Sequence, residues 1–328
     1  MKTRTLALTT IAILFLLAST AFAGAFNEAG NFTRTFKVDG PVQLDAQTGS
    51  GDIHVVPGDS ATVQITGHVT VSHWFASGSG AEERLKQVLA NPPVRQNGNH
   101  VVISKVEESL RRNVAIDYEV VVPAATSANL ETGSGDVTAS RITGPLSIHT
   151  GSGDVKLEAI GANVETTAGS GDLTVHGVKG SLKAQSGSGN IVADGIAGAI
   201  EAHTGSGDIR AEQTAAGDSD LAAGSGNIHL KGLQGGLKLE TGSGDVTVEG
   251  APSHDWSVHT GSGEVYLTLQ QEQGFHLVAQ SSGGTISMAR PITISSLSNR
   301  SDKSVDGVVG NGGPTVQVRT GSGDIRIQ

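Results

Sequence analysis

The chain has 328 residues, of which 46 are glycine, none is cysteine and only 3% are aromatic. The absence of cysteine excludes disulfide bonds, thiol catalysis and iron–sulfur clusters. The formal net charge of -10 at pH 7 disfavours nucleic acid and anionic lipid headgroups as partners.

Residues 1–23 have the pattern of a cleaved signal peptide. Lys2 and Arg4 precede an apolar run over residues 6–18, and the small residues of Ala-Phe-Ala at 21–23 form a cleavage site. The run is too short to span a bilayer comfortably, and no later stretch is apolar enough to do so. Because the signal peptide is expected to be cleaved, we expect an exported chain, periplasmic or extracellular, with no transmembrane anchor. Because the chain has no cysteine, a bacterial lipoprotein anchor is excluded. Loss of the two cations changes the formal charge to -12.

Residues 24–126 predict an irregular β section that caps the structure that follows. Alternating apolar residues on either side of Gly40-Pro41 predict two strands, and further strands are expected over 53–56, 63–71, 101–106 and 114–122. A helix is predicted near 81–90, with acids in its first turn and two prolines after its end. Its apolar residues Leu85, Val88 and Leu89 share one face.

Residues 127–328 are dominated by one corner motif, Thr-Gly-Ser-Gly-Asp, and its near copies. From Asp136 to Glu264 the copies follow at steps of 18, 18, 18, 18, 19, 18 and 19 residues, which is typical of a repeat architecture. Each unit also contains two short runs of alternating apolar residues, such as Val137 and Ala139, then Leu146 and Ile148. Alternation with a period of two predicts two short strands in each unit.

The predicted fold is an all-β, single-stranded β-solenoid, a β-helix or β-roll of 18-residue coils, continuous with the N-terminal section. A triangular hexapeptide helix needs apolar residues six apart, but Val137, Thr143 and His149 do not fit, so a flattened coil of two sheets is favoured. Residues 281–285 are a damaged copy of the motif, and 295–313 predict a polar excursion out of one coil. We expect the last copy, 320–324, to close the final coil at the C-terminus.

Four segments carry a family resemblance: the repeated T-G-S-G-D-[V/I/L], V-D-G-P-V-Q-L-D-A-Q-T-G-S-G-D-I-H-V at 38–55, I-D-Y-E-V-V-V-P at 116–123, and G-N-G-G-P-T-V-Q-V-R-T-G-S-G-D-I-R-I at 310–327. Together they resemble a bacterial β-strand-repeat family of proposed adhesins, domain-of-unknown-function family 4097, also called LiaG-like. The resemblance covers essentially the whole mature chain. It implies an extracytoplasmic β-solenoid and brings no catalytic residues with it.

The corner motif has a structural interpretation and two chemical ones. In the structural one, glycines with positive φ make a tight corner and the Asp or Asn bonds the backbone of its own turn; these glycines are Gly133, Gly135, Gly151, Gly153, Gly169, Gly171, Gly187, Gly189, Gly205 and Gly207. In the second, carboxylates stacked about 4.8 Å apart bind calcium, namely Asp136, Asp154, Asp172, Asp208 and Asp245. The structural interpretation is favoured because Asn190 and Asn227 interrupt the charge, and because calcium-roll repeats read G-G-x-G-x-D. The serines of the motif are too many and too equivalent to be nucleophiles, which need one activated copy. We expect no cofactor.

Histidines precede the motif at three places. If the 18-residue register holds, they share a column that runs Glu131, His149, Thr167, Gln185, His203, Ala222, Glu240, His259 and Gln280. The histidines then recur every three coils, about 14 Å apart at the strand spacing, which is too far to share one metal ion. Glu131 with His149 and Glu240 with His259 are expected to be exposed pairs on adjacent coils.

These features favour an exported, non-catalytic solenoid, an adhesin or cell-envelope scaffold or binding module. Its partner would be an envelope or surface ligand, protein or polysaccharide. Two alternatives stay open: a carbohydrate-active β-helix enzyme, and an envelope-stress accessory protein that binds a membrane partner. The enzyme is disfavoured because its aromatic residues are scattered and no pair of acids stands out for glycoside hydrolysis; the residues are Trp74, Tyr118, Trp256 and Tyr266.

Overall fold

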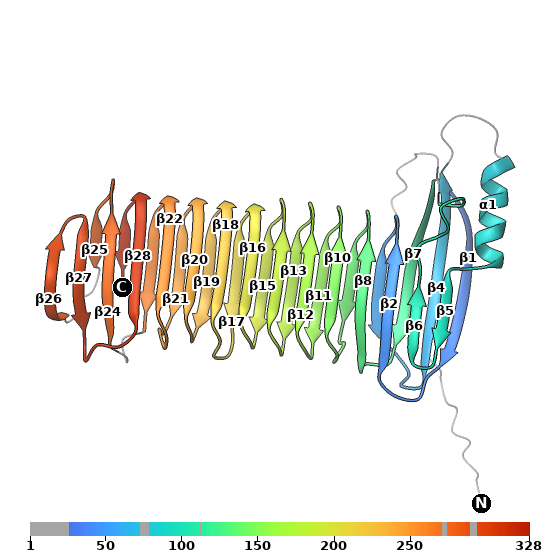
Figure 1. Ribbon diagram of the computed structural model, residues 1–328, viewed down its shortest axis with the longest axis horizontal. Helices are drawn as coiled ribbons and strands as arrows, with labels where there is room; N and C mark the ends of the chain where they lie inside the picture. The colour runs from blue at the N-terminus through green and yellow to red at the C-terminus, as the bar shows by residue number, and fades with distance from the viewer. Residues whose placement is uncertain (1–25, 73–78, 112, 271–273, 289–293) are drawn as a thin grey trace, which may run out of the picture.

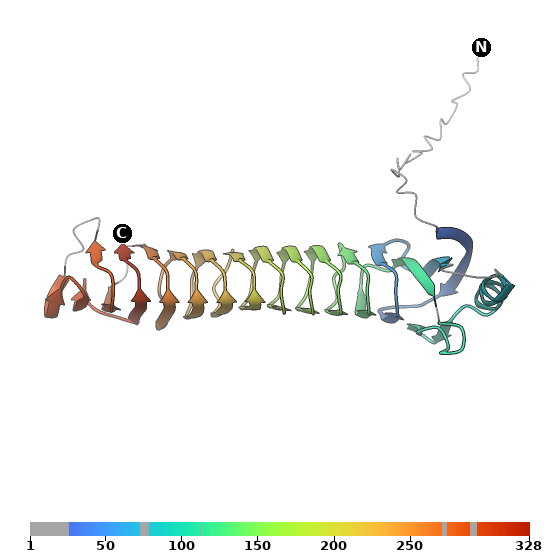
Figure 2. The same ribbon diagram turned by 90° about the horizontal axis from the view of Figure 1, so that it is seen from above.

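The computed structural model describes residues 26–72, 79–111, 113–270, 274–288 and 294–328. The predicted signal peptide and Trp74 lie outside these residues. The described chain forms two long sheets, stacked as two layers of a flat, elongated body with one short helix at one end (Figure 1 and Figure 2). The predicted two-sheet β-solenoid is confirmed.

One layer is a sheet of 14 strands. In spatial order its strands are β1 (Phe26–Lys37), β4 (Thr62–Ser72), β7 (Val114–Val122), β3 (Ile53–Pro57), β9 (Val137–Ser140), β11 (Val155–Ile160), β13 (Leu173–Val178), β15 (Ile191–Ile196), β17 (Ile209–Gln213), β19 (Ile228–Leu233), β21 (Val246–Gly250), β23 (Val265–Leu269), β29 (Ile325–Ile327) and β25 (Ile286–Met288).

The other layer is a sheet of 15 strands. Its order, from the C-terminal end of the body to the N-terminal end, is β26 (Ile294–Ser301), β27 (Ser304–Val309), β24 (Phe275–Ser281), β28 (Thr315–Ser322), β22 (Trp256–Ser262), β20 (Leu237–Ser243), β18 (Ser219–Ser225), β16 (Ile200–Ser206), β14 (Leu182–Ser186), β12 (Val164–Ala168), β10 (Leu146–Thr150), β8 (Thr126–Thr132), β2 (Val42–Thr48), β6 (His100–Ile103) and β5 (Val94–Asn97).

Each coil of the array contributes one strand to each sheet. Neighbouring coils pair in parallel and in register, so that Val155 lies beside Leu173 in one sheet and Val164 beside Leu182 in the other. These side chains point inward and are at most 2% exposed, while the residues between them face solvent. Burying one such aliphatic side chain stabilises the fold by about 1.5–3 kcal/mol. The core is therefore a thin layer of aliphatic residues that runs the length of the body.

The solenoid begins earlier than the sequence suggests. The unit β2–β3 is already a complete coil, because β2 pairs with β8 and β3 with β9 in the register of the later coils. The expectation that the regular array starts near residue 127 is therefore wrong. Residues 58–125 are instead an insertion between the first and second coils, which the 84-residue gap between Asp52 and Asp136 conceals in the sequence.

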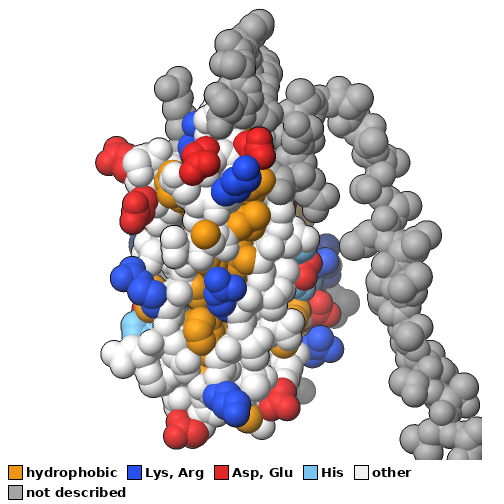
Figure 3. Space-filling view, turned by 90° about the vertical axis from the view of Figure 1, so that its right-hand side faces the viewer, with side chains coloured by type: hydrophobic (Ala, Val, Ile, Leu, Met, Phe, Trp, Pro, Cys, Tyr) orange, Lys and Arg blue, Asp and Glu red, His pale blue; other side chains and the backbone are white. Residues whose placement is uncertain are grey.

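The insertion and β1, which precedes the first coil, build the cap at the N-terminal end. Strands β1, β4 and β7 pair in antiparallel fashion beyond β3, and β5–β6 form a hairpin beyond β2. The helix is present as α1 (Ser79–Ala90), with Val88 buried and Leu89 packed against Gly30 of β1. Viewed from this end, a band of hydrophobic side chains runs between charged ones (Figure 3). Among the described residues, no helix has the length and apolar character needed to cross a membrane.

The C-terminal end also departs from sequence order. The last coil, β28–β29, lies directly on β22–β23, and the earlier unit β24–β25 stacks outside it. The last copy of the motif therefore does not close the body, contrary to expectation. Within the expected excursion at 295–313, β26 and β27 form an antiparallel hairpin that leaves the coil and extends the fifteen-stranded sheet beyond β24. This hairpin covers a strand edge that would otherwise be open.

Candidate functional site

The ten predicted turn glycines lie at the corner that links the fifteen-stranded sheet to the fourteen-stranded one. Of these ten, only Gly207 has a positive φ, of 156°, so the expected positive φ is wrong for the others. The corner excludes a side chain for another reason: a Cβ on Gly187 would lie 2.4 Å from the carbonyl oxygen of Gly169 in the neighbouring coil. For Gly189 the corresponding distance to Gly171 is 2.0 Å. Close stacking of main chains, coil on coil, is what requires glycine here.

The acidic residue of the motif forms a ladder between coils. Asp154 Oδ1 accepts the main-chain N–H of Asp172 at 2.9 Å, and Asp172 Oδ1 accepts that of Asn190 at 2.7 Å. The same bond recurs at every step from Asp52 to Glu264. The predicted Asx-turn within one corner is thus wrong, because the acceptor serves the next coil. An amide oxygen accepts this bond as well as a carboxylate does, which explains why Asn190 and Asn227 fit.

The candidate calcium residues are members of this ladder. Their Oδ1 atoms are engaged with main-chain N–H groups, which leaves one outward oxygen per coil. In the described parts of the chain, no three His, Cys, Asp or Glu side chains are grouped to hold a metal ion. The residues that the sequence offered as a calcium-binding column are Asp136, Asp154, Asp172, Asp208 and Asp245.

The threonine and serine of the motif have different environments. Thr150 is buried, and its hydroxyl donates to Gly135 O at 3.2 Å and accepts from Gly153 N at 3.0 Å. Ser186 and Thr204 donate in the same way to the second glycine of the preceding corner. Ser188, in contrast, is exposed. The buried hydroxyl therefore satisfies a carbonyl group that the tight corner shields from water.

Glu264 ends this ladder because its side chain is one methylene longer. Its carboxylate accepts from the Tyr266 hydroxyl and from Arg326, whose guanidinium lies 5.1 Å from the centre of the Tyr266 ring. These bonds, that of Tyr266 first, hold the pKa of Glu264 below its ordinary value. The pKa of Asp324, in the next coil, is lowered by bonds from the main chain and hydroxyl of Thr285. This cluster ties the displaced C-terminal coil to its neighbours.

The histidine column has the predicted register from Glu131 to His259. Arg319 then follows His259, in place of the expected Gln280, because β28 is inserted there. Glu131 bonds Lys105 at 2.5 Å. His203 lies 3.5 Å from Asp220 on the next coil.

Two of the described aromatic residues, Trp256 and Tyr118, are buried and offer no surface for sugar stacking. Trp256 is 1% exposed and donates its indole N–H to Gly235 O, and Tyr118 is 2% exposed with its ring edge against Phe32. Burial raises the pKa of the Tyr118 hydroxyl. Among the described hydrogen bonds, one joins an imidazole to a hydroxyl, that between His54 and Thr138, and it lies on an exposed sheet face. A nucleophile there would have no enclosed site around it.

A groove of about 1210 Å³ lies on the outer side of the fifteen-stranded sheet. It crosses the starts of the strands from β2 to β22, which at about 4.8 Å per strand is roughly 38 Å. Exposed hydroxyl and amide side chains line it, such as Ser147, Asn163 and Ser181, with aliphatic residues such as Leu182 and Ile200 between them. No single repeat contains this groove, so it could not be predicted from the repeat pattern of the sequence.

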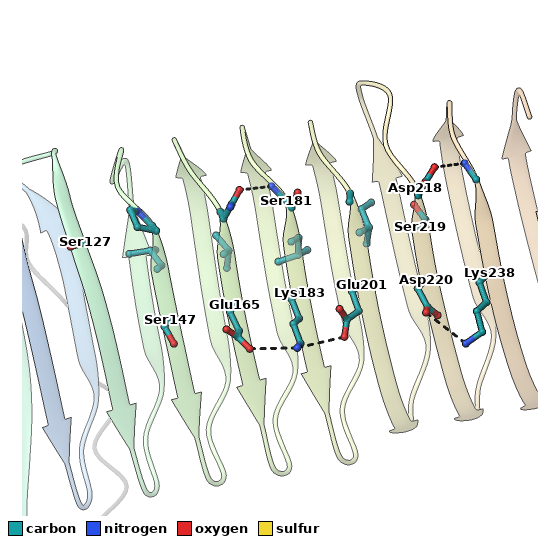
Figure 4. Close-up of a pocket in the computed structure, with 18 of the residues that line it drawn as sticks. Ser127, Ser147, Glu165, Ser181, Lys183, Glu201, Asp218, Ser219, Asp220 and Lys238 are labelled. Carbon is teal, nitrogen blue, oxygen red and sulfur yellow. Dashed lines mark hydrogen bonds and ion pairs between the residues drawn. The ribbon is translucent and has the colours of Figure 1, made fainter. Parts of the chain in front are cut away.

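Six carboxylates and two lysines line the groove. Lys183 lies between Glu165 and Glu201, at 3.6 and 3.7 Å, and Figure 4 shows the three on neighbouring strands. Lys238 is 3.7 Å from Asp220. Since both cations are already paired with acids, the groove as a whole presents negative charge; the six acids are Asp45, Glu165, Glu201, Asp218, Asp220 and Asp255.

The two 19-residue steps of the sequence shape one end of this groove. Each has its extra residue in the segment before the strand of the fifteen-stranded sheet, that is, before β18 and before β22. The resulting corners meet across the coil between them, where Asp218 Oδ1 lies 3.2 Å from His254 Nδ1 and accepts the N–H of Gly236 at 2.7 Å. The Gly236 bond, followed by His254, lowers the pKa of Asp218. The two 19-residue steps were therefore the signal in the sequence that could have located this end of the groove.

Comparison with known proteins adds a family and a set of solved structures. A family model described as Toastrack DUF4097 matches residues 43–197 and 180–328. No curated protein matches the chain. Among solved structures, a proposed cell adhesion protein from Clostridium sporogenes is 10% identical, with 91% of this chain and 99% of that chain covered and a TM-score of 0.22. Proposed adhesins from Bacteroides fragilis (14% identity, 91% and 97% covered, TM-score 0.31) and Parabacteroides distasonis (16%, 92% and 98%, 0.29) are also similar.

Proposed function

The chain belongs to the Toastrack DUF4097 family, and on that premise we propose that it is an exported, non-catalytic binding module that holds an extended envelope or surface ligand along its groove. The observation that carries the proposal is the length of the groove, which runs without interruption over the strands from β2 to β22. Sites for small molecules are usually enclosed and take up most of the ligand surface. A shallow channel across many equivalent strands suits a linear chain that lies on the sheet.

The solenoid gives such a site rigidity. Main-chain bonds between coils, the Asp/Asn ladder and the buried hydroxyls fix each coil on the next, so that the groove residues are held by strands and not by loops. A ligand that binds such a surface loses little affinity to ordering of the protein. The same regularity gives many similar contacts along one chain, which favours a polymer over a single small molecule.

Binding to isolated envelope polysaccharides, before and after filling the groove, tests this function. Ser147→Trp and Ser181→Trp place a large side chain in the groove from exposed positions. The matched control is Thr174→Trp, on β13 of the opposite sheet, whose side chain also faces outward. We expect both groove variants to lose binding by tenfold or more, on the order of 1.4 kcal/mol, and the control to bind as the parent does.

Two outcomes would replace this proposal. Release of reducing sugars from any envelope polysaccharide would establish a carbohydrate-active enzyme instead. Stoichiometric copurification with one membrane protein, unaffected by the two groove substitutions, would favour the envelope-stress accessory role. Equal binding by Ser181→Trp and the parent would show that the groove is not where the ligand lies.

A further inference from the structure

The charge of the groove restricts what the ligand can be, and the inference below rests on the proposed function. With histidine neutral, the six carboxylates outnumber the two lysines that line the groove. Lys183 and Lys238 are each within 4 Å of two acids and are therefore compensated by the protein itself. The excess of carboxylates over lysines would repel an anionic polymer, whereas a cationic one is attracted.

The negative charge is concentrated where the two bulged corners lie. Asp218 and Asp220 come from one corner and Asp255 from the other, with Gly236 on the coil between. A Cβ at Gly236 would lie 3.1 Å from Asp218 Oδ1 and 3.3 Å from His254 Cβ, so a side chain at this position would crowd both corners. Asp218 is 71% exposed and Asp220 42%, so both carboxylates are accessible to a ligand (Figure 4).

A buried hydroxyl without a partner lies in the same place. Ser219 sits between Asp218 and Asp220, is 3% exposed, and its Oγ has no hydrogen-bond partner among the described residues. Its neighbours in the same column are the aliphatic Ile200 and Leu237. Because Ser219 occupies the inward-facing position of β18, its hydroxyl is directed into the core, and the groups that face a ligand in the groove are the flanking carboxylates of Asp218 and Asp220.

We propose that this end of the groove binds the ammonium groups of a linear glycan built from free amino sugars. The three carboxylates give charge-assisted hydrogen bonds to the amines, and the hydroxyl and amide side chains further along pair with sugar hydroxyls. A basic peptide fits less well: extended peptides bind by adding to a free sheet edge, while this groove lies on a sheet face whose main-chain groups are already paired.

The test compares two sugar oligomers of equal length, one of glucosamine and one of N-acetylglucosamine, by isothermal titration calorimetry. The nitrogen is a positively charged ammonium group in the glucosamine oligomer and a neutral acetamide in the N-acetylglucosamine oligomer. The glucosamine oligomer should bind at least about tenfold more tightly, and its affinity should fall as salt is raised. A lysine oligomer is titrated as the third probe and should bind more weakly than the glucosamine oligomer.

Two Asp-to-Asn variants separate the effect of the carboxylate charge on binding from any effect on the fold. Asp218→Asn removes the charge but keeps an oxygen that accepts the Gly236 N–H, as Asn163 does for Ser181 in the same column at 3.0 Å. It should weaken glucosamine binding about tenfold, the usual effect of losing one charge-assisted bond. Asp208→Asn is the matched control, because it makes the same change at the other corner, where Asn190 and Asn227 already occur. It should bind as the parent does.

The results separate this inference from the function on which it rests. Equal affinity for the two sugar oligomers, or no effect of Asp218→Asn, overturns amine recognition, while loss of binding in Ser181→Trp would still support the groove. Tighter binding of the lysine oligomer than of the glucosamine oligomer overturns the glycan assignment in favour of a basic peptide. Unchanged glucosamine binding by Ser181→Trp overturns both.

Discussion

Replacement of Gly187 by alanine tests why the corner motif contains glycine. The added Cβ would lie 2.4 Å from Gly169 O, whereas the shortest ordinary contacts are near 3.4 Å, so the two coils must separate by roughly 1 Å. That movement stretches the bond from Gly187 N to Ala168 O, now 3.1 Å. Overpacking of this kind costs 1–3 kcal/mol and a weakened hydrogen bond about 1 kcal/mol more, so we expect a loss of about 3 kcal/mol.

Gly177→Ala is the control that separates this clash from backbone strain. Gly177 has a φ of 72°, but a Cβ there would be 3.7 Å from its nearest neighbour. The equivalent residue of the preceding coil is Ala159, which has a φ of 56°, so alanine is already accommodated at this corner. The positive φ costs 1–2 kcal/mol, and part of this is offset because glycine loses more entropy on folding. A net loss of about 1 kcal/mol or less is expected.

Thermal unfolding followed by circular dichroism measures both variants. Gly187→Ala should lower the melting temperature by roughly 6 °C or more, and Gly177→Ala by only a few degrees. Ser188→Ala, at the exposed position of the same corner, should change it little. If Gly187→Ala melts with the parent, or if Gly177→Ala is the more damaging of the two, the close stacking of coils is not what requires glycine.

Four further results are expected. Asp154→Ala removes the acceptor for the N–H of Asp172 and should cost about 1–2 kcal/mol in urea unfolding, whereas Asp154→Asn should cost much less; equal losses would show that the charge matters and not the bond. Thr150→Val leaves Gly135 O without its buried donor and should cost about 1–3 kcal/mol, more than Thr150→Ser. Excess calcium and chelator should give the same melting temperature, since a ligand that binds only the folded state must raise it; a chelator-induced loss of the β signal would establish a metal column. Finally, folding lowers the pKa values of Glu264 and Asp324. Their contribution to folding stability is therefore present above the unfolded pKa, which is 4.5 for Glu264, and is lost as the pH falls through the folded pKa. Glu264→Gln should accordingly show a smaller fall in melting temperature between neutral pH and about pH 3 than the parent does.

The sequence alone determined the local architecture of this protein. A period of 18 residues with two alternating runs between glycine corners predicts one coil of two strands, because alternation fixes which side chains face inward. Propensity and stop signals also identified α1 near its observed ends. These features depend on neighbours within one coil, so they can be derived from a single repeat. The histidine column followed from the same register as far as His259.

Only the tertiary structure decided which coils are neighbours at the two ends and what they form together. Asp52 stacks under Asp136 and Asp324 beyond Glu264 although long insertions separate them in sequence, because any corner of this shape can stack on any other. The need for glycine at position 187 and the partner of each ladder carboxylate were likewise set by the adjacent coil and not by the turn itself. The groove arises from residues on successive coils, and its acidic end from two single-residue expansions at one corner. Stacking converts a one-residue difference in sequence into a surface that no isolated repeat possesses.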